Sequence, residues 1–245
     1  MTPLTTNELI EVWEKGLMLS PIKRSLHLVC ASSGLQSLNQ AADLSIGQRD
    51  TRLLQLREYQ FGSRLSNTTN CPECSEQLEW FNDLKELQLQ PLSRDNNSPH
   101  YTLRLEDFEI VYRLPTTRDL ITLTEINNAD PESTLLNSCI LEAKRNGAYI
   151  DPLQLPAEIT SAINNKMSDE DPQANITMLL TCAGCGHEWE SVFDIGRYLW
   201  AEINSWAIGL LGDVYFLAKT FGWSENHILS MSQQRRQLYL EMIRA

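Results

Sequence analysis

Two pairs of cysteines with the same spacing constrain this chain more than any other feature. Cys71 and Cys74 flank Pro-Glu, and Cys182 and Cys185 flank Ala-Gly. Two thiols three residues apart can both face one ion when the chain turns between them, and four thiolates match the tetrahedral site that zinc prefers. The sequence therefore predicts that a single ion joins two segments that residues 75–181 separate.

The residues around each pair predict a knuckle at the tip of a strand hairpin. A short alternating run that contains tryptophan follows each pair, at residues 77–81 and 187–193. Pro72 presets one turn dihedral, and glycine at positions 184 and 186 permits the positive φ values that such turns need. Ser75 stands where the second knuckle has Gly186, so we expect some backbone strain in the first knuckle.

The chemistry of the pairs favours a structural site over a catalytic one. Four thiolates leave no open coordination position for water, and iron bound as in rubredoxin is the chemical alternative. A redox dithiol normally opens a helix after a strand, whereas each pair here precedes a strand-like run. Two unrelated surface pairs are the simplest competing interpretation. His187 is expected to point away from the ion, and Cys30 and Cys139 are expected to be buried structural thiols.

Composition and charge narrow the classes of function. The formal net charge is −12, which argues against binding along a phosphate backbone because that requires clustered lysine and arginine. No stretch of 18 apolar residues predicts a membrane span, so direct membrane insertion is not expected. The N-terminus lacks a basic-then-apolar pattern, and the cysteine pairs suit a reducing compartment, so a cytoplasmic location is expected.

Catalytic motifs find little support in the sequence. The acidic run at residues 169–171 precedes Pro172 and is expected to be a solvated loop rather than a pair of catalytic carboxylates. We find no phosphate loop, no dinucleotide glycine fingerprint and no nucleophile elbow. We therefore expect no catalytic residues, no small-molecule substrate and no cofactor other than the metal.

Hydrophobic periodicity predicts an α+β fold that is mostly helical. Helices are expected to follow Thr5, Pro21, Gln48, Thr116, Asp130 and Pro156, with strands within residues 101–114 and 176–180 and an exposed turn at residues 94–99. The helix that opens at Asp130 is expected to end near Gly147. A long helix over residues 195–221 carries an apolar stripe wide enough to predict burial on more than one side.

These patterns predict four regions that together form one compact unit. They are an N-terminal helical bundle (residues 1–66), a discontinuous zinc ribbon (residues 67–92 and 174–194), an inserted strand and helix subdomain (residues 93–173) and a C-terminal helical region (residues 195–245).

Several of these segments, taken together, resemble a known family. They are residues 46–50, 53–54, 56–58, 61–62, 71–74, 171–174, 182–195, 199–202, 206–207, 222–225, 228–229 and 235–240. In this combination the chain is similar to the zinc-ribbon-containing baseplate proteins of contractile phage tails and phage-tail-like injection systems. Ser75 and Tyr215 depart from the pattern, where glycine and histidine are expected.

The resemblance implies a non-enzymatic structural or assembly role in a baseplate. It implies one structural zinc ion on Cys71, Cys74, Cys182 and Cys185, and contacts with other baseplate or tail proteins. A zinc ribbon that binds nucleic acid, as in a transcription accessory protein, is the alternative function, and the net charge argues against it. A metal-dependent enzyme that uses the thiolate site is a third hypothesis.

Overall fold

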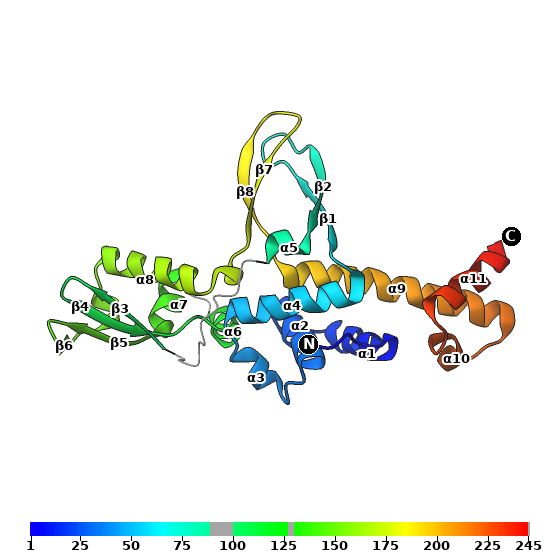
Figure 1. Ribbon diagram of the computed structural model, residues 1–245, viewed down its shortest axis with the longest axis horizontal. Coiled ribbons are helices and arrows are strands. Elements are labelled where there is room, and N and C mark those ends of the chain that lie inside the picture. Colours follow the sequence, from blue (N-terminus) through cyan, green and yellow to red (C-terminus); the bar gives the residue numbers. More distant parts are fainter. Residues whose placement is uncertain (89–99, 127–129, 245) are drawn as a thin grey trace.

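The computed structural model describes residues 1–88, 100–126 and 130–244. Helices form an elongated body, from which two β-hairpins project together as an arm (Figure 1). The strands and helices between the hairpins in sequence lie at one end of the body, and the C-terminal helices lie at the other. The fold is α+β and mostly helical, as the sequence predicts. The turn expected at residues 94–99 lies outside the described residues.

The N-terminal helices are α1 (Thr6–Gly16), α2 (Pro21–Ser33), α3 (Leu38–Ala42) and α4 (Ile46–Phe61). The start of α1 is a capping box, in which Thr5 accepts from the backbone of Glu8 and the Glu8 carboxylate accepts from Thr5. Gly34 ends α2 in the left-handed conformation, with a φ of 66°. The predicted helices are confirmed here, and the short α3 is an addition.

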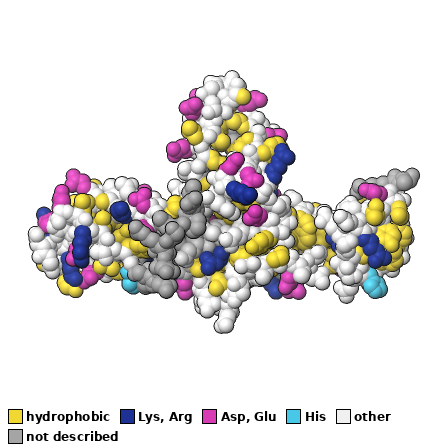
Figure 2. All heavy atoms as spheres, in the orientation of Figure 1, with side chains coloured by type: hydrophobic (Ala, Val, Ile, Leu, Met, Phe, Trp, Pro, Cys, Tyr) yellow, Lys and Arg dark blue, Asp and Glu magenta, His cyan; other side chains and the backbone are white. Residues whose placement is uncertain are grey.

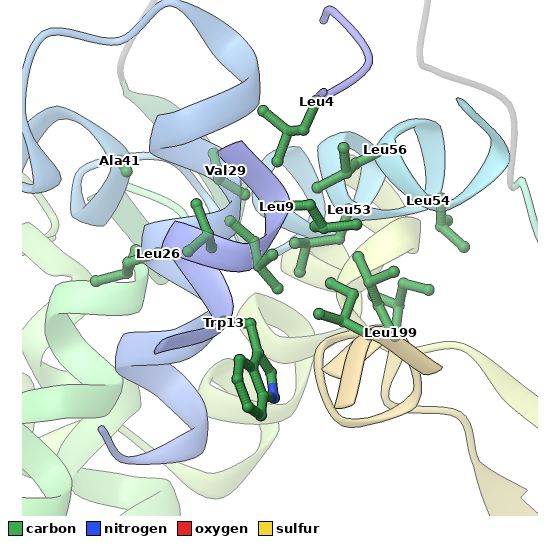
Figure 3. Close-up of a cluster of buried hydrophobic side chains, with 14 of the residues drawn as sticks. Leu4, Leu9, Trp13, Leu26, Val29, Ala41, Leu53, Leu54, Leu56 and Leu199 are labelled. Carbon is green, nitrogen blue, oxygen red and sulfur yellow. The ribbon is translucent and has the colours of Figure 1, made fainter. Parts of the chain in front are cut away.

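The main hydrophobic core lies where these helices pack against the first half of α9 (Ile195–Phe221). Leu53, Leu56 and Leu199 are fully buried there, and Figure 3 shows them converging from α4 and α9. At the edge of this core, Trp13 donates a hydrogen bond from its indole nitrogen to the side-chain oxygen of Asn204, 3.0 Å away. This core holds the base of α9, and therefore the segments that lead into the hairpin arm.

The prediction that α9 is buried on more than one side holds only for its first half. In the second half, Ile208, Tyr215 and Phe216 are exposed, each by at least 50%. Leu210 is the last residue of α9 in the main core, and beyond it α9 packs against α10 (Glu225–Leu229) and α11 (Gln233–Arg244). Leu217, Ile228 and Leu240 form a small separate core at this end.

Between the hairpins, the chain forms a four-stranded antiparallel sheet with the order β3-β4-β5-β6. This inserted segment has a hydrophobic core between the sheet and its helices, and the core includes Ile110 and Ile163, both fully buried. Its elements are β3 (Tyr101–Leu105), β4 (Phe108–Tyr112), α6 (Thr117–Glu125), α7 (Pro131–Cys139), β5 (Ile140–Arg145), β6 (Ala148–Tyr149), the 3-10 turn η1 (Pro152–Gln154), α8 (Ala157–Glu170) and the 3-10 turn η2 (Pro172–Ala174).

The helix expected to run to Gly147 ends eight residues earlier, at Cys139, so that prediction is wrong. Asn146 and Gly147 have φ values of 50° and 80°, and they form a two-residue turn between Arg145 and Ala148, which pair across the hairpin. Two successive left-handed residues are the hairpin signal of Asn-Gly, and they turn β5 back onto β6.

The acidic run before Pro172 is not a solvated loop throughout. Asp171 is only 9% exposed, and its carboxylate accepts a hydrogen bond of 2.9 Å from the backbone N–H of Gly47 at the start of α4. Burial raises the pKa of Asp171, although the Gly47 N–H acts in the opposite direction. Asp171 thus joins the end of α8 to the N-terminal helices across 124 residues of sequence, and the prediction of a solvated acidic loop is wrong for this residue.

The joint leaves no room for a side chain at Gly47. A Cβ atom there would overlap the Asp171 carboxylate and lie 3.0 Å from the backbone nitrogen of Ala174. We expect Gly47→Ala to lower the free energy of unfolding by about 2 kcal/mol, because the carboxylate must leave its hydrogen bond. Chemical denaturation measures this change. Gly209→Ala is the control, since a Cβ on exposed Gly209 in α9 meets nothing within 4 Å and the helix gains about 0.5–1 kcal/mol. Equal effects of the two substitutions would contradict the proposed joint.

No helix in the described ranges is both long enough and apolar enough to span a membrane.

Candidate metal centre

The two cysteine pairs lie at the tips of the two projecting hairpins. Strands β1 (Arg64–Asn70) and β2 (Gln77–Asp83) flank the first pair, and β7 (Thr177–Thr181) and β8 (Glu188–Val192) flank the second. Both hairpins are antiparallel, and the short helix α5 (Leu84–Leu87) follows the first. We call these two hairpins, with their tips, the hairpin arm. The strands expected after each cysteine pair are confirmed.

The four sulfur atoms meet at the tip of the arm. All lie within 4.8 Å of one another, with 3.7 Å between Cys71 and Cys185 and 3.6 Å between Cys74 and Cys182. A tetrahedron with metal–sulfur bonds of about 2.3 Å has edges of about 3.8 Å, whereas a disulfide holds its sulfurs at about 2.05 Å. The sulfurs are therefore separate thiols, spaced as ligands of one metal ion.

Each hairpin tip is closed by the same pair of backbone hydrogen bonds. The N–H of the first cysteine donates to the carbonyl oxygen five residues later, and the N–H of the residue after the second cysteine donates back to the first cysteine's carbonyl oxygen. These bonds are Cys71 to Glu76 (2.8 Å), Ser75 to Cys71 (2.9 Å), Cys182 to His187 (2.9 Å) and Gly186 to Cys182 (2.9 Å). Two distant segments thus adopt equivalent knuckles.

The equivalence extends to one strained residue. Ser75 has a φ of 61° and Gly186 a φ of 73°, both in the left-handed region that favours glycine. We expect Ser75→Gly to raise the free energy of unfolding by about 0.5–1 kcal/mol, because it removes the steric cost at Cβ. The reverse change, Gly186→Ser, should destabilise the protein. Thermal melts of both variants check this, and a destabilised Ser75→Gly protein would contradict it.

The sulfurs differ in their electrostatic surroundings. The backbone N–H of Cys185 is the main influence that lowers the pKa of Cys182, to about 7. At Cys74 the Glu76 N–H lowers the pKa, but the sulfurs of Cys185 and Cys182 outweigh it and raise the pKa to about 12. One thiolate therefore forms readily, and its neighbours resist a second negative charge. A bound cation would relieve this repulsion and favour all four thiolates.

Burial distinguishes the two positions of each knuckle. Cys71 and Cys182 are buried between the hairpins, whereas Cys74 and Cys185 are exposed at the rim. The His187 ring stacks on the Trp189 ring, with centroids 5.8 Å apart. Among the described residues, the four cysteine sulfurs are the potential ligands that lie close enough together to hold one metal ion, and His187 is not among them.

The two remaining cysteines lie in helices, as expected. Cys139 is fully buried in the core of the inserted sheet, and burial raises its pKa. Cys30 is half-buried rather than buried, and its thiol lies 3.4 Å from the carbonyl oxygen of Leu35. The prediction of a buried thiol is confirmed for Cys139 and is only partly met by Cys30.

Side chains at the base of the arm hold it to the body. The Tyr198 hydroxyl, on α9, both donates to the carbonyl oxygen and accepts from the N–H of Ser66, each at 3.0 Å. On α4, Arg57 forms a two-pronged ion pair with Glu202 at 2.9 and 2.7 Å. Sequence reasoning missed both contacts, because a polar residue on a helix does not reveal a partner more than a hundred residues away.

Most of this chain matches a known protein family. A family model described as T4 bacteriophage base plate protein matches residues 30–199, which include both knuckles, the inserted sheet and the start of α9. No curated protein and no solved structure matches the chain. The matched segment is more than half of the sequence, and it agrees with the family resemblance of the sequence motifs. The chain therefore belongs to the T4 bacteriophage base plate protein family.

Proposed function

We propose that this chain is a non-enzymatic, zinc-stabilised structural or assembly protein in the baseplate of a contractile phage-tail-like injection system. The observation that carries the proposal is the meeting of four cysteine sulfurs within 4.8 Å at the tip of a projecting arm, in a chain of a baseplate family. A metal ion bound by all four cysteines would join the tips of the two hairpins and stabilise the arm. The protein then acts through contacts with other baseplate or tail proteins.

Zinc is the ion we propose for Cys71, Cys74, Cys182 and Cys185. Four thiolates at tetrahedral spacing form a closed site, and a closed zinc site stabilises a fold without offering a position for substrate. Metal analysis of the purified protein tests this: we expect one zinc per chain and no visible absorption. Iron with the visible bands of a thiolate site would overturn the assignment of zinc, and an absence of any metal would overturn the site.

We also propose the four regions predicted from the sequence as the working parts of the protein. The inserted segment has its own core around Ile110 and Ile163, separate from the main core. That separation supports a subdomain that grew between the two halves of the ribbon. The boundary between residues 92 and 93 lies outside the described residues.

Assembly in the cytoplasm, without nucleic acid, is the setting we propose. The hairpin tips carry Glu73 and Glu76 in one knuckle and Glu188 after the other, so a phosphate backbone would be repelled there. Salt-dependent binding of DNA or RNA to the purified protein at low micromolar concentration would support the alternative of a nucleic-acid-binding ribbon.

Deletion of the gene tests the proposed role directly. We expect tail particles to be absent, or to lack a complete baseplate by electron microscopy, and expression of the intact gene in trans to restore them. Normal, active particles from the deletion strain would overturn the proposal.

A further inference from the structure

The hairpin arm presents strand edges to which no other strand is paired. Each hairpin is a two-stranded sheet, so within the described ranges each of its strands is paired on one side only. An open edge is a row of backbone donors and acceptors, and another extended chain is what satisfies it best. The identity of a partner therefore depends on which edge is accessible and on the side chains beside it.

The backbone of β8 directs alternate residues toward its open edge. Two backbone hydrogen bonds mark the ends of the β7–β8 pairing. The N–H of Cys182 donates to the carbonyl oxygen of His187 (2.9 Å), and the N–H of Phe193 donates to the carbonyl oxygen of Ile176 (2.8 Å). Because hydrogen-bonded pairs alternate along antiparallel strands, the odd-numbered residues of β8 face β7. The N–H and C=O groups of Glu188, Glu190 and Val192 consequently point to the open edge.

The neighbouring edges are less suitable for an incoming strand. On β1, the Tyr198 hydroxyl already occupies both backbone groups of Ser66. On β7, the residues opposite Glu188, Glu190 and Val192 are Thr181, Leu179 and Thr177, which carry no charge. On β2, the exposed alternate residues include one carboxylate, Glu79, and the Phe81 ring beside it is covered by the guanidinium of Arg64. Among the described strands of the arm, the edge of β8 is therefore the one that combines unpaired backbone groups with two successive carboxylates.

The side chains beside this edge favour a basic partner. Glu188 and Glu190 are exposed, and no lysine or arginine pairs with either among the ion pairs of the described residues. Residues 176–194 contain no lysine or arginine at all. Figure 2 shows acidic side chains along the margins of the arm, with basic ones toward its base. Val192, 67% exposed, follows the two carboxylates on the same face.

We propose that β8 receives an extended segment of another baseplate protein as an added antiparallel strand. Directly opposite residues share a face, so the segment places a β-branched apolar residue opposite Val192, then lysine or arginine opposite Glu190 and again opposite Glu188. Read from its N-terminus, its pattern is apolar, any residue, basic, any residue, basic. This inference deepens the proposed function by naming the chemistry of the partner.

The space next to the apolar end of β8 fits this orientation. A groove of about 840 Å³ runs along the base of the arm, and Val192, Trp80 and Trp206 are among the residues that line it. An apolar side chain opposite Val192 would lie at this groove. Val192 is also two residues from Asp194, the N-cap of α9. β8 therefore leads directly into the main core, and a segment bound at this end of β8 lies close to that core.

The experiment uses the full-length zinc-loaded protein and a synthetic nine-residue peptide. The peptide carries valine and two lysines in the predicted order at its central alternate positions, with threonine elsewhere. We expect salt-sensitive binding by fluorescence anisotropy, and amide NMR shifts centred on Glu188, Glu190 and Val192. Methylating the backbone nitrogens of the valine and lysines should abolish binding, whereas methylating the intervening threonines should not, because only the former face β8.

Charge exchange supplies the matched control. The double substitution Glu188→Lys and Glu190→Lys should weaken binding of the lysine peptide roughly tenfold and confer binding of a peptide with glutamate in place of lysine. The substitution Glu79→Lys on β2, which is also exposed on the arm, should leave the binding of both peptides unchanged.

Three results would overturn the proposal. The first is wild-type protein that binds the lysine peptide and the glutamate peptide equally well. The second is amide shifts that map to another strand edge. The third is a folded wild-type protein that does not bind the lysine peptide, with a Glu188→Gln and Glu190→Gln variant that self-associates. In that last case the two carboxylates only guard an edge against aggregation. A normal deletion strain would refute the baseplate role itself, whereas a defective deletion strain with no peptide binding would refute only strand docking on β8.

Discussion

Replacing Cys182 with serine is expected to lower the free energy of unfolding by roughly 3–5 kcal/mol and to release the proposed zinc ion. Structural zinc supplies about 10–16 kcal/mol of apparent binding free energy in zinc-finger peptides, so the loss of one of four thiolates removes a large share of the stability of the arm. Cys182 is 1% exposed and its sulfur lies 3.6 Å from that of Cys74, so the substitution falls inside the four-sulfur cluster. Chemical denaturation and metal content per chain measure the two effects.

The loss should begin in the arm rather than in the body. The main core is formed by the N-terminal helices and α9, and the four cysteines do not belong to it. We therefore expect limited proteolysis of Cys182→Ser to cut first within residues 64–83 or 177–192, as mapped by mass spectrometry. Treatment of the wild-type protein with a strong chelator should give the same fragments.

Cys30→Ser is the matched control for this prediction. Cys30 is a half-buried thiol far from the arm in sequence, and serine can also hydrogen-bond to the carbonyl oxygen of Leu35. We expect it to retain the metal and to change stability by less than about 1 kcal/mol. A Cys182→Ser protein with wild-type stability and protease resistance would mean that the ion is dispensable to the fold.

Features decided by neighbouring residues could be predicted from the sequence. The knuckles follow from ligand spacing and turn residues, and α9 follows from a stripe of apolar residues that repeats every three or four positions. The family resemblance drew on these segments among others, and the match over residues 30–199 confirms that the chain belongs to a baseplate family. The meeting of the four sulfurs could be predicted because a shared ion is a strong reason for two such motifs to coexist.

Features decided by distant partners could not be predicted in the same way. Residues 140–145 follow a helix without a break, and they form a strand because β4 pairs with them. The Asn146-Gly147 turn was the available signal for that change. Asp171 reads as part of an acidic loop until Gly47 is seen to donate to it. Burial of a charged residue depends on a surface that assembles only in the folded chain.

Arg57 illustrates the same point at the base of the arm. Its side chain is 3% exposed, and its guanidinium bonds both carboxylate oxygens of Glu202 and the carbonyl oxygen of Gly62, which ends α4. It thus holds the C-terminal end of α4 against α9, next to Gly62 and Ser63, which lead into β1. An arginine in a helix with several other charged residues gives no sign of this role, because such residues usually face solvent.

Arg57→Met is expected to lower the free energy of unfolding by about 3 kcal/mol. Breaking a buried ion pair by removing one partner costs about 3–5 kcal/mol, and the 26% exposure of Glu202 places this pair at the lower end because water can solvate the remaining carboxylate. The exposed pair of Arg118 and Asp43 is the control, where Arg118→Met should cost less than about 1 kcal/mol.

Adding Glu202→Leu to Arg57→Met should recover part of the loss, because the unpaired charge is then removed as well. Denaturation of the wild type, Arg57→Met, Glu202→Leu and the double variant completes a double-mutant cycle and gives the coupling energy between the two side chains. Strictly additive effects of the two substitutions would show that Arg57 stabilises the base of the arm through packing and its bond to Gly62, and not through Glu202.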